Sequence, residues 1–210
     1  MPAPADAAPG RPKDLAKRAA ILAAAKDLFV EQGFEATSME AVAAQAGVSK
    51  LTVYSHYGDK LGLLREAVRA VGEDYLPPAL FGGRGRRSLR SHLRRVAQAF
   101  VRLVASPESI AVHRMMAADA SLAGQIGAVY YQSGPLRVRG DCAAMLAELS
   151  ARGELAIADP ERAARQLLVL LRGDLLDCAM WGVGADTKDP NHQAHIEATL
   201  DLFLRAYAPL

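Results

Sequence analysis

Apolar residues recur every three or four positions along almost the whole chain of 210 residues. No segment alternates apolar and polar positions over the length of a strand. Alanine and leucine abound, whereas aromatic residues make up only 6% of the chain, and this composition favours helices. The pattern predicts an all-α protein of about nine to ten helices, whose ends are marked by glycine and proline.

The first four predicted helices follow one another in the sequence with short connections. Their expected spans are about 14–32, 37–46, 49–57 and 59–76. Ser49 and Asp59 are good N-caps for the third and fourth helices. Thr37 is expected to cap the second, with Glu40 completing a capping box. The stripe of the first helix that we expect to be buried consists of Ile21, Ala24 or Ala25, Leu28 and Phe29.

A loop rich in glycine, proline and arginine at 77–88 is the expected boundary between two domains. Before it we expect a disordered N-terminal arm at 1–13 and a small helical domain at 14–76. After it we expect a larger helical bundle at 77–210. The expected helices of the bundle are about 89–105, two segments within 107–132, then 135–151, 160–182 and 190–207.

Composition and charge exclude several classes of protein. The net charge of +2 is too small to indicate a polyanionic partner by itself. Cys142 and Cys178 have no metal-ligand or disulfide spacing, so we expect two small buried residues in a reducing compartment, with a redox-sensing pair as the alternative. The start has no signal peptide and the apolar stretch 167–181 is broken by charges. We therefore expect a cytoplasmic protein that neither spans a membrane nor carries a cofactor.

The stretch GVSKLTVYSHYGDK, residues 47–60, concentrates hydroxyl, aromatic and cationic side chains on one short helix. Two short helices joined by a tight turn containing glycine are the outline of a helix-turn-helix, here at 38–57. Ala43 is small where the helices must cross, and Gly47 suits the positive φ of the turn. The alternative is a polar, solvated face on a small helical hairpin.

The side chains of this stretch divide by their position on the third helix. Those of the first turn are placed to reach base edges in a major groove: Lys50, Leu51 and Thr52. Others suit phosphate oxygens, which set the register without reading sequence: Tyr54, His56 and Lys60.

Residues 14–71 resemble the DNA-binding domain of the TetR family of bacterial transcriptional regulators. The resemblance is carried, in order, by F-x-x-x-G-F (29–34), TSMEAVA (37–43), AGVS (46–49) and VYSHYGDK (53–60). It implies a homodimer whose third helices, residues 49–57, enter the major groove of a palindromic operator in double-stranded DNA. The residues expected to contact DNA are Thr37, Ser38, Ser49, Lys50, Leu51, Thr52, Tyr54, Ser55, His56, Tyr57 and Lys60.

Two features of the sequence depart from the family pattern. Leu51 stands where relatives often have a small residue, so its contact would be apolar, for example with a thymine methyl group. Leu61 and Gly62 replace an acidic pair, and Gly62 is expected to weaken the fourth helix by up to about 1 kcal/mol relative to alanine.

The segment between Tyr75 and Pro107 contains arginines but no acidic residue. These arginines are Arg84, Arg86, Arg87, Arg90, Arg94, Arg95 and Arg102. One interpretation is non-specific attraction to the DNA backbone. The favoured alternative is a solvated arginine face that covers apolar surface with its side-chain stems.

The C-terminal half resembles the AefR-like subgroup in SIAVHRMMAADAS (109–121) and in YYQSGPLRVRGDCAAMLAELSARGEL (130–155). By the family pattern, the helices at about 160–182 and 190–207 pair with their copies in a four-helix dimer interface. The residues expected there are Leu168, Leu171, Leu175, Ile196, Leu200 and Phe203. The family also implies a pocket for a small-molecule inducer, with His113, Met116, Tyr130, Tyr131, Met145, Asp177 and Trp181 as candidate lining residues.

The leading hypothesis is therefore a homodimeric repressor that a small molecule releases from its operator. The alternative is a helix-turn-helix protein without such a switch, controlled by a protein partner or by its abundance. An enzyme is not expected, because no acid–base pair, nucleophile or metal set is evident. His192 and His195 lack a third metal ligand and are interpreted as part of a helix surface.

Overall fold

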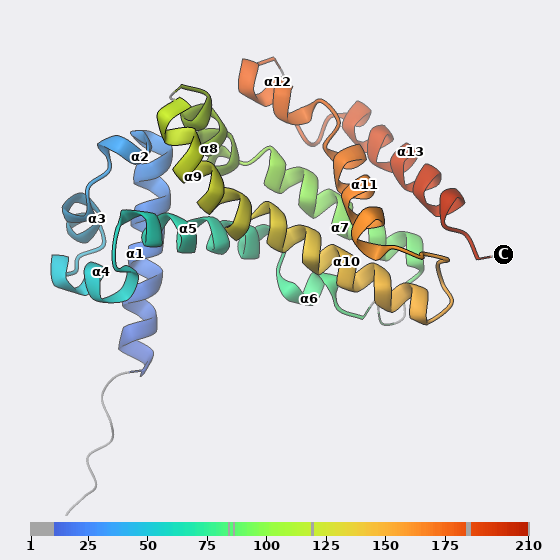
Figure 1. The fold of residues 1–210 in the computed structure, drawn as a ribbon, viewed down its shortest axis with the longest axis horizontal. Helices are drawn as coiled ribbons and strands as arrows, with labels where there is room; N and C mark the ends of the chain where they lie inside the picture. The colour runs from blue at the N-terminus through green and yellow to red at the C-terminus, as the bar shows by residue number, and fades with distance from the viewer. Residues whose placement is uncertain (1–10, 84, 86, 119, 184–185, 210) are drawn as a thin grey trace, which may run out of the picture. The chain divides into compact units, whose positions relative to one another are not determined.

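A computed structural model of the chain describes residues 11–83, 85, 87–118, 120–183 and 186–209. Over these residues every regular element is a helix (Figure 1), which confirms the all-α prediction. The chain forms two compact units, Met1–Ala67 and Val68–Leu210. The expected N-terminal arm falls mostly outside the described residues, and α1 already begins at Arg11.

The first unit contains four helices and the beginning of a fifth. They are α1 (Arg11–Glu31), α2 (Gly33–Ala36), α3 (Met39–Gln45), α4 (Lys50–Tyr57) and α5 (Lys60–Tyr75), which continues into the second unit. Ile21, Val42 and Val53 are fully buried and form the small core that the periodicity predicts. Gly47, at φ 64°, makes the turn between α3 and α4.

Two predictions about helix starts in this unit are wrong. Ser38, rather than Thr37, caps α3, because its hydroxyl accepts the Ala41 N–H at 3.0 Å. Thr37 instead donates its hydroxyl to the Gly33 carbonyl at 2.7 Å. Glu40 completes no capping box with Thr37, and its carboxylate pairs with Lys50 of α4.

Helix propensity also gives the wrong expectation for Gly62, which it treats only as a source of instability. A Cβ at this position would lie 2.1 Å from the backbone oxygen of Tyr57, far inside van der Waals contact. Glycine therefore permits the close approach between the end of α4 and the start of α5. Asp59 caps α5 as expected, accepting the Gly62 N–H at 2.6 Å.

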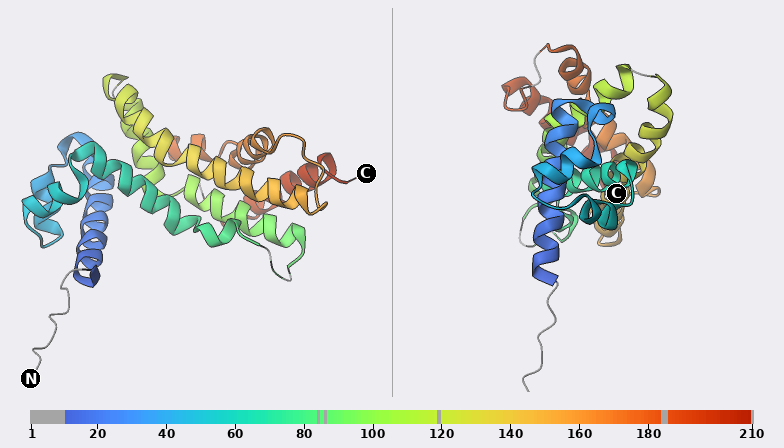
Figure 2. Two further views of the ribbon diagram at one scale, coloured as in Figure 1. Left: turned by 60° about the horizontal axis from the view of Figure 1, so that its bottom comes forward. Right: turned by 90° about the vertical axis from the view of Figure 1, so that its left-hand side faces the viewer.

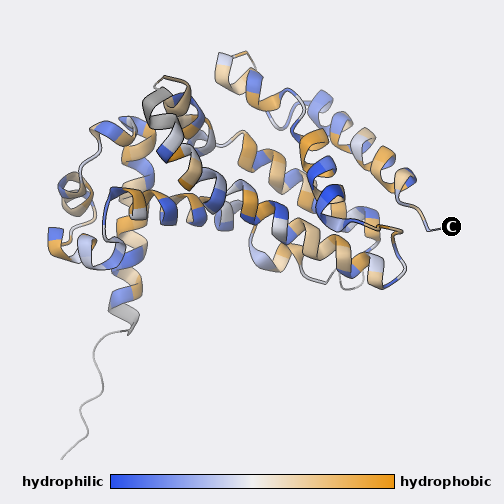
Figure 3. Cartoon of the chain, in the orientation of Figure 1, coloured by the Kyte–Doolittle hydropathy of each residue, from blue (hydrophilic) through white to orange (hydrophobic). Residues whose placement is uncertain are grey.

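The second unit is a helical bundle. It contains the rest of α5, then α6 (Pro78–Phe81), α7 (Leu89–Val104), α8 (Pro107–Ala118), α9 (Ala120–Ser133), α10 (Pro135–Ala151), α11 (Pro160–Arg172), α12 (Leu175–Trp181) and α13 (Pro190–Ala206). Helix α11 packs against α7, α10 and α13 (Figures 1 and 2). Apolar and polar residues alternate around these helices (Figure 3), as in helices with one buried side.

The division of the chain differs from the expected one at the boundary between the units and within the helix expected at 160–182. The two units part between Ala67 and Val68, inside α5, rather than at the 77–88 loop, which contains the short helix α6. The helix expected at 160–182 is broken at Gly173, whose φ of 49° and ψ of −134° end α11. The break at Gly173 and the short helices α2 and α6 give more helical segments than the nine to ten expected.

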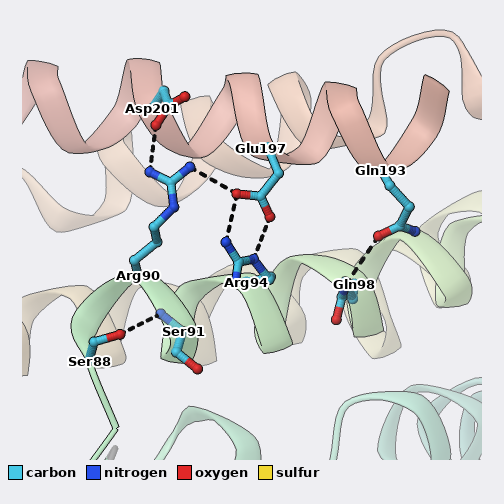
Figure 4. Close-up of polar contacts among 8 residues, drawn as sticks. All are labelled: Ser88, Arg90, Ser91, Arg94, Gln98, Gln193, Glu197 and Asp201. Atoms are coloured by element: carbon cyan, nitrogen blue, oxygen red, sulfur yellow. Dashed lines mark hydrogen bonds and ion pairs between the residues drawn. The ribbon is translucent and has the colours of Figure 1, made fainter. Parts of the chain in front are cut away.

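Two arginines of the arginine-rich segment, Arg90 and Arg94, form ion pairs within the bundle (Figure 4). Arg90 of α7 donates to Asp201 at 2.5 Å and to Glu197 at 2.8 Å, both on α13. Arg94 donates to the same Glu197 carboxylate through two nitrogens, one of them at 2.8 Å. These two guanidinium groups therefore join α7 to α13, while Arg84 and Arg86 lie outside the described residues.

The two cysteines lie in different surroundings. Cys142 is fully buried on α10, and burial raises the pKa of its thiol to about 12. Because the thiolate is the reactive form, this cysteine is unsuited to redox sensing. Cys178 of α12 is half-buried. None of the described helices is long and apolar enough to span a bilayer.

Candidate functional site

Helix α4 presents a row of exposed side chains on the side away from the small core. Ser49 caps the helix by accepting the Thr52 N–H at 3.1 Å, as predicted. Leu51, in the first turn, is 78% exposed. Lys50 and Tyr54 lie one helical turn apart, with the Lys50 ammonium 5.5 Å from the centre of the Tyr54 ring.

Lys50 also forms an ion pair with Glu40 of α3, so this pair crosses the helix-turn-helix. The hydrogen bond from Lys50 lowers the pKa of the Glu40 carboxyl, and the same bond raises the pKa of the Lys50 ammonium. Both groups are therefore charged near neutral pH. Sequence analysis identifies Lys50 as a candidate DNA contact but not Glu40, because nothing in a spacing of ten residues shows that the two side chains meet.

The predicted hydroxyl contacts are partly engaged within the helix. The hydroxyls of Ser49 and Thr52 lie 2.8 Å apart, and Ser55 donates to the Thr52 carbonyl at 2.9 Å. Ser38 is exposed but its oxygen caps α3. These groups add polarity to the surface, whereas Lys50, Leu51 and Tyr54 extend the longest side chains from it.

Two residues predicted to contact DNA have buried side chains, and their contact with DNA stays a prediction. Thr37 is 1% exposed and bonded to backbone carbonyls. Tyr57 is 7% exposed, and its hydroxyl donates to the Arg18 carbonyl of α1 at 3.2 Å. Burial raises the pKa of Tyr57 as well. Both residues join the helices of the first unit and cannot reach a phosphate without its rearrangement.

His56 and Lys60 hold contacts inside the same unit. His56 Nε2 lies 3.1 Å from the Asp14 carboxylate of α1. Lys60 Nζ donates to the carbonyls of Phe34 at 2.7 Å and Glu35 at 3.1 Å, at the carboxyl end of α2. A phosphate contact by either residue stays a prediction, whereas their role in joining helices is a property of the described structure.

The candidate ligand residues separate into two groups. His113 of α8 and Tyr130 of α9 meet edge to face at 5.2 Å, and Tyr130 shares a 3.3 Å hydrogen bond with Ser109. Met116 lies beside them, since a Cβ on Gly127 would meet its sulfur at 3.6 Å. Met145 is buried in the core of the bundle.

The remaining three ligand candidates do not line an interior site. Tyr131, Asp177 and Trp181 are all exposed, and Trp181 is 76% exposed. Tyr131 accepts a hydrogen bond from Arg139 at 3.1 Å. The aromatic character of Tyr131 and Trp181 therefore does not indicate burial at these two positions.

The residues predicted for the dimer interface lie in the core of the bundle, and their part in dimerisation stays a prediction. All six of them, Leu168, Leu171, Leu175, Ile196, Leu200 and Phe203, are buried within the core of one protomer. The exposed apolar side chains of the same helices are their neighbours Val169, Leu170 and Leu202. His195 Nε2 donates to the Leu170 carbonyl oxygen at 2.7 Å, and its exposed side chain fits the expected helix surface.

Comparison with known protein families covers both units. Residues 21–67 match the model of bacterial regulatory proteins of the tetR family. Residues 91–209 match the model of the C-terminal domain of AefR-like transcriptional repressors, and this match alone covers more than half of the chain. Proteins of this family are DNA-binding transcriptional regulators and not enzymes.

Individual relatives agree with the family models. The chain is 38% identical over 68 residues to the HTH-type transcriptional regulator YdeS of Bacillus subtilis, covering 32% of this chain and 34% of YdeS, about a third of each. A crystal structure of a TetR-family regulator from Mesorhizobium loti superposes with a TM-score of 0.75 at 27% identity, covering 94% of this chain and 99% of that one. The flavonoid-responsive regulator FrrA gives a TM-score of 0.70 at 33% identity, covering 92% and 97%.

The helix-turn-helix with exposed side chains on the outer face of α4, the helical bundle that follows it and the match of both family models lead to one conclusion. The chain belongs to the TetR family of bacterial transcriptional regulators.

Proposed function

We propose that this chain is a homodimeric repressor that binds a palindromic operator through α4 and is released by a small molecule bound in the second unit. The observation that carries the proposal is the outer face of α4, where Lys50, Leu51 and Tyr54 project from a helix that is otherwise fixed to α1 and α3. An α-helix of this size fits the major groove. Leu51 suits a thymine methyl group, and Tyr54 suits a phosphate.

The homodimer is proposed to form through the outer sides of α11 and α13. On α13 the exposed residues Ala194, Ala198, Leu202 and Arg205 follow each other at intervals of three or four, so they form one stripe. Two small residues and a leucine allow close approach of a second helix. Val169 and Leu170 add exposed apolar surface on α11, and a two-fold axis would bring both helices together with their copies.

The small molecule is proposed to bind beside His113 and Tyr130. These rings offer an aromatic surface, and burial raises the pKa of Tyr130, which keeps its hydroxyl neutral as a hydrogen-bond donor or acceptor. FrrA is a flavonoid-responsive protein, and its similarity over most of this chain supports a small, aromatic ligand class. Repression agrees with the AefR-like repressor model that matches the second unit.

Footprinting of the DNA upstream of the chain's own gene, with the full-length protein, tests the proposal. We expect two protected half-sites related by a two-fold axis and spaced by whole helical turns. Sedimentation at micromolar concentration should give a dimer. Uniform protection of all sequences, or a monomer bound to a single half-site, would contradict the proposal.

A further inference from the structure

The ion pair between Glu40 and Lys50 lies on the side of the helix-turn-helix that carries the proposed reading residues. Glu40 is in the first turn of α3 and Lys50 is the first residue of α4. Both side chains are about half exposed, at 54% and 57%. Neither is needed to cap a helix, because Ser38 and Ser49 do so.

The pair restricts how Lys50 can meet DNA. A free lysine is a flexible point charge, and it can bind a phosphate in place of a base edge. Here the ammonium is held between the Glu40 carboxylate and the Tyr54 ring. The carboxylate cancels most of its attraction for the DNA backbone and repels a phosphate that approaches the pair.

The donors that remain select one base. An ammonium has three N–H donors, and one is given to Glu40. Two are left, which matches the two acceptors, O6 and N7, that guanine presents in the major groove. Adenine presents an amino donor beside N7, and that donor would oppose the second N–H of Lys50.

We propose that Glu40 is a positioning residue that makes Lys50 specific for guanine, by directing its two free N–H groups to O6 and N7 of one guanine in each operator half-site. The proposal rests on the proposed function and adds a base preference to it. Glu40 thus lowers non-specific affinity while raising discrimination between sequences.

Selection of bound sequences from a randomised DNA library, followed by anisotropy titrations, tests this inference with the full-length chain. The position read by Lys50 is the one whose preference disappears in Lys50→Ala. We expect the wild type to favour guanine over adenine there by about 5- to 100-fold. In Glu40→Gln the preference should fall below about fivefold, while affinity for unrelated DNA rises.

A double-variant cycle shows whether Glu40 acts through Lys50. Adding Glu40→Gln to Lys50→Ala should leave base preference unchanged. The matched control is Glu31→Gln, which removes the same charge from the exposed end of α1 and should keep the guanine preference. Thermal unfolding checks that each surface variant remains folded.

The possible outcomes distinguish failure of this inference from failure of the proposed operator-binding function. If the wild type selects a half-site but Glu40→Gln keeps its guanine preference, or the Lys50 position is not guanine, the inference is wrong and the operator-binding function stands. If the wild type selects no sequence at all, the proposed function is overturned together with the inference.

Discussion

Helices α4 and α11 each place an exposed residue close to a buried one of the same kind. On α4, Tyr54 is exposed and Tyr57, three residues on, is 7% exposed. On α11, Leu168 is 9% exposed and its neighbour Val169 is 59% exposed. In both helices the buried member packs in the core of the protomer, and the exposed member faces the partner proposed above, DNA for α4 and a second protomer for α11.

The outward stripe of each helix determines what the helix can bind, and its inward stripe contributes to the stability of the unit. A shift of one residue on a helix turns a side chain by about 100°, enough to move it from one stripe to the other. Substitutions at neighbouring positions therefore separate folding from binding.

The largest effect is expected from Tyr57→Ala. Loss of a buried ring and of its hydrogen bond to Arg18 should lower the free energy of unfolding by about 3–5 kcal/mol. The exposed neighbour Tyr54→Ala should cost no more than about 0.5 kcal/mol. Chemical denaturation measures both values, and equal losses at the two positions would break the distinction between the two sides of α4.

The distinction between exposed and buried positions on α11 is tested by Val169→Arg and Leu168→Arg. Because a two-fold axis brings two copies of the new charge to one interface, Val169→Arg should weaken the dimer at least about 100-fold and leave the protomer folded. Leu168→Arg buries a charge in the core and should unfold the second unit instead. Sedimentation and circular dichroism distinguish the outcomes; a dimeric Val169→Arg protein would refute this interface.

A smaller effect, of unexpected sign, is expected from Gly62→Ala. Alanine is normally the better helix former, but its Cβ would collide with the Tyr57 oxygen. We expect the first unit to lose about 1–3 kcal/mol of stability through this overlap. Thermal unfolding beside Gly124→Ala, where a Cβ meets open space, provides the control. A more stable Gly62→Ala protein would show that α4 and α5 can separate.

The smallest effect concerns the ion pairs between α7 and α13. Hydrogen bonds from Arg94 and Arg90 lower the pKa of Glu197 from an ordinary 4.5 to about 2. The stabilisation is therefore complete above pH 4.5 and is lost as the pH falls toward 2. Since Glu197 is partly solvated, Glu197→Gln should lower Tm by only about 2 °C at neutral pH. The difference between variant and wild type should vanish near pH 2, and a constant difference would exclude this carboxylate as its source.

Much of the fold follows from the sequence, because glycine, proline and capping residues mark helix ends by local chemistry. Ser49, Gly58 and Asp59 bound their helices as predicted. The break at Gly173 was missed, since glycine within an apolar run is also compatible with a continuous helix. The close approach at Gly62, which leaves no room for a Cβ, is a contact between two helices, and helix propensity does not describe such contacts.

The candidate sites were predictable only in part. The motif identifies α4, but two aromatic residues of that motif, Tyr54 and Tyr57, differ in burial for reasons of packing. For α11 and α13, a leucine in a protomer core and a leucine in a dimer interface have the same chemistry, so sequence cannot tell them apart. The ion pairs of Arg90 and Arg94 could not be predicted from the sequence, because their acidic partners lie more than a hundred residues away along the chain.

The most direct test of the account is an anisotropy titration of operator DNA at fixed salt with three proteins: wild type, the double variant Lys50→Ala and Leu51→Ala, and Tyr57→Phe. The double variant removes the exposed reading groups and should bind at least about tenfold more weakly. Tyr57→Phe removes only a buried hydroxyl and should bind as the wild type does. Wild-type affinity in the double variant, or a tenfold loss in Tyr57→Phe, would contradict the assignment of the outer face of α4 as the DNA-binding surface.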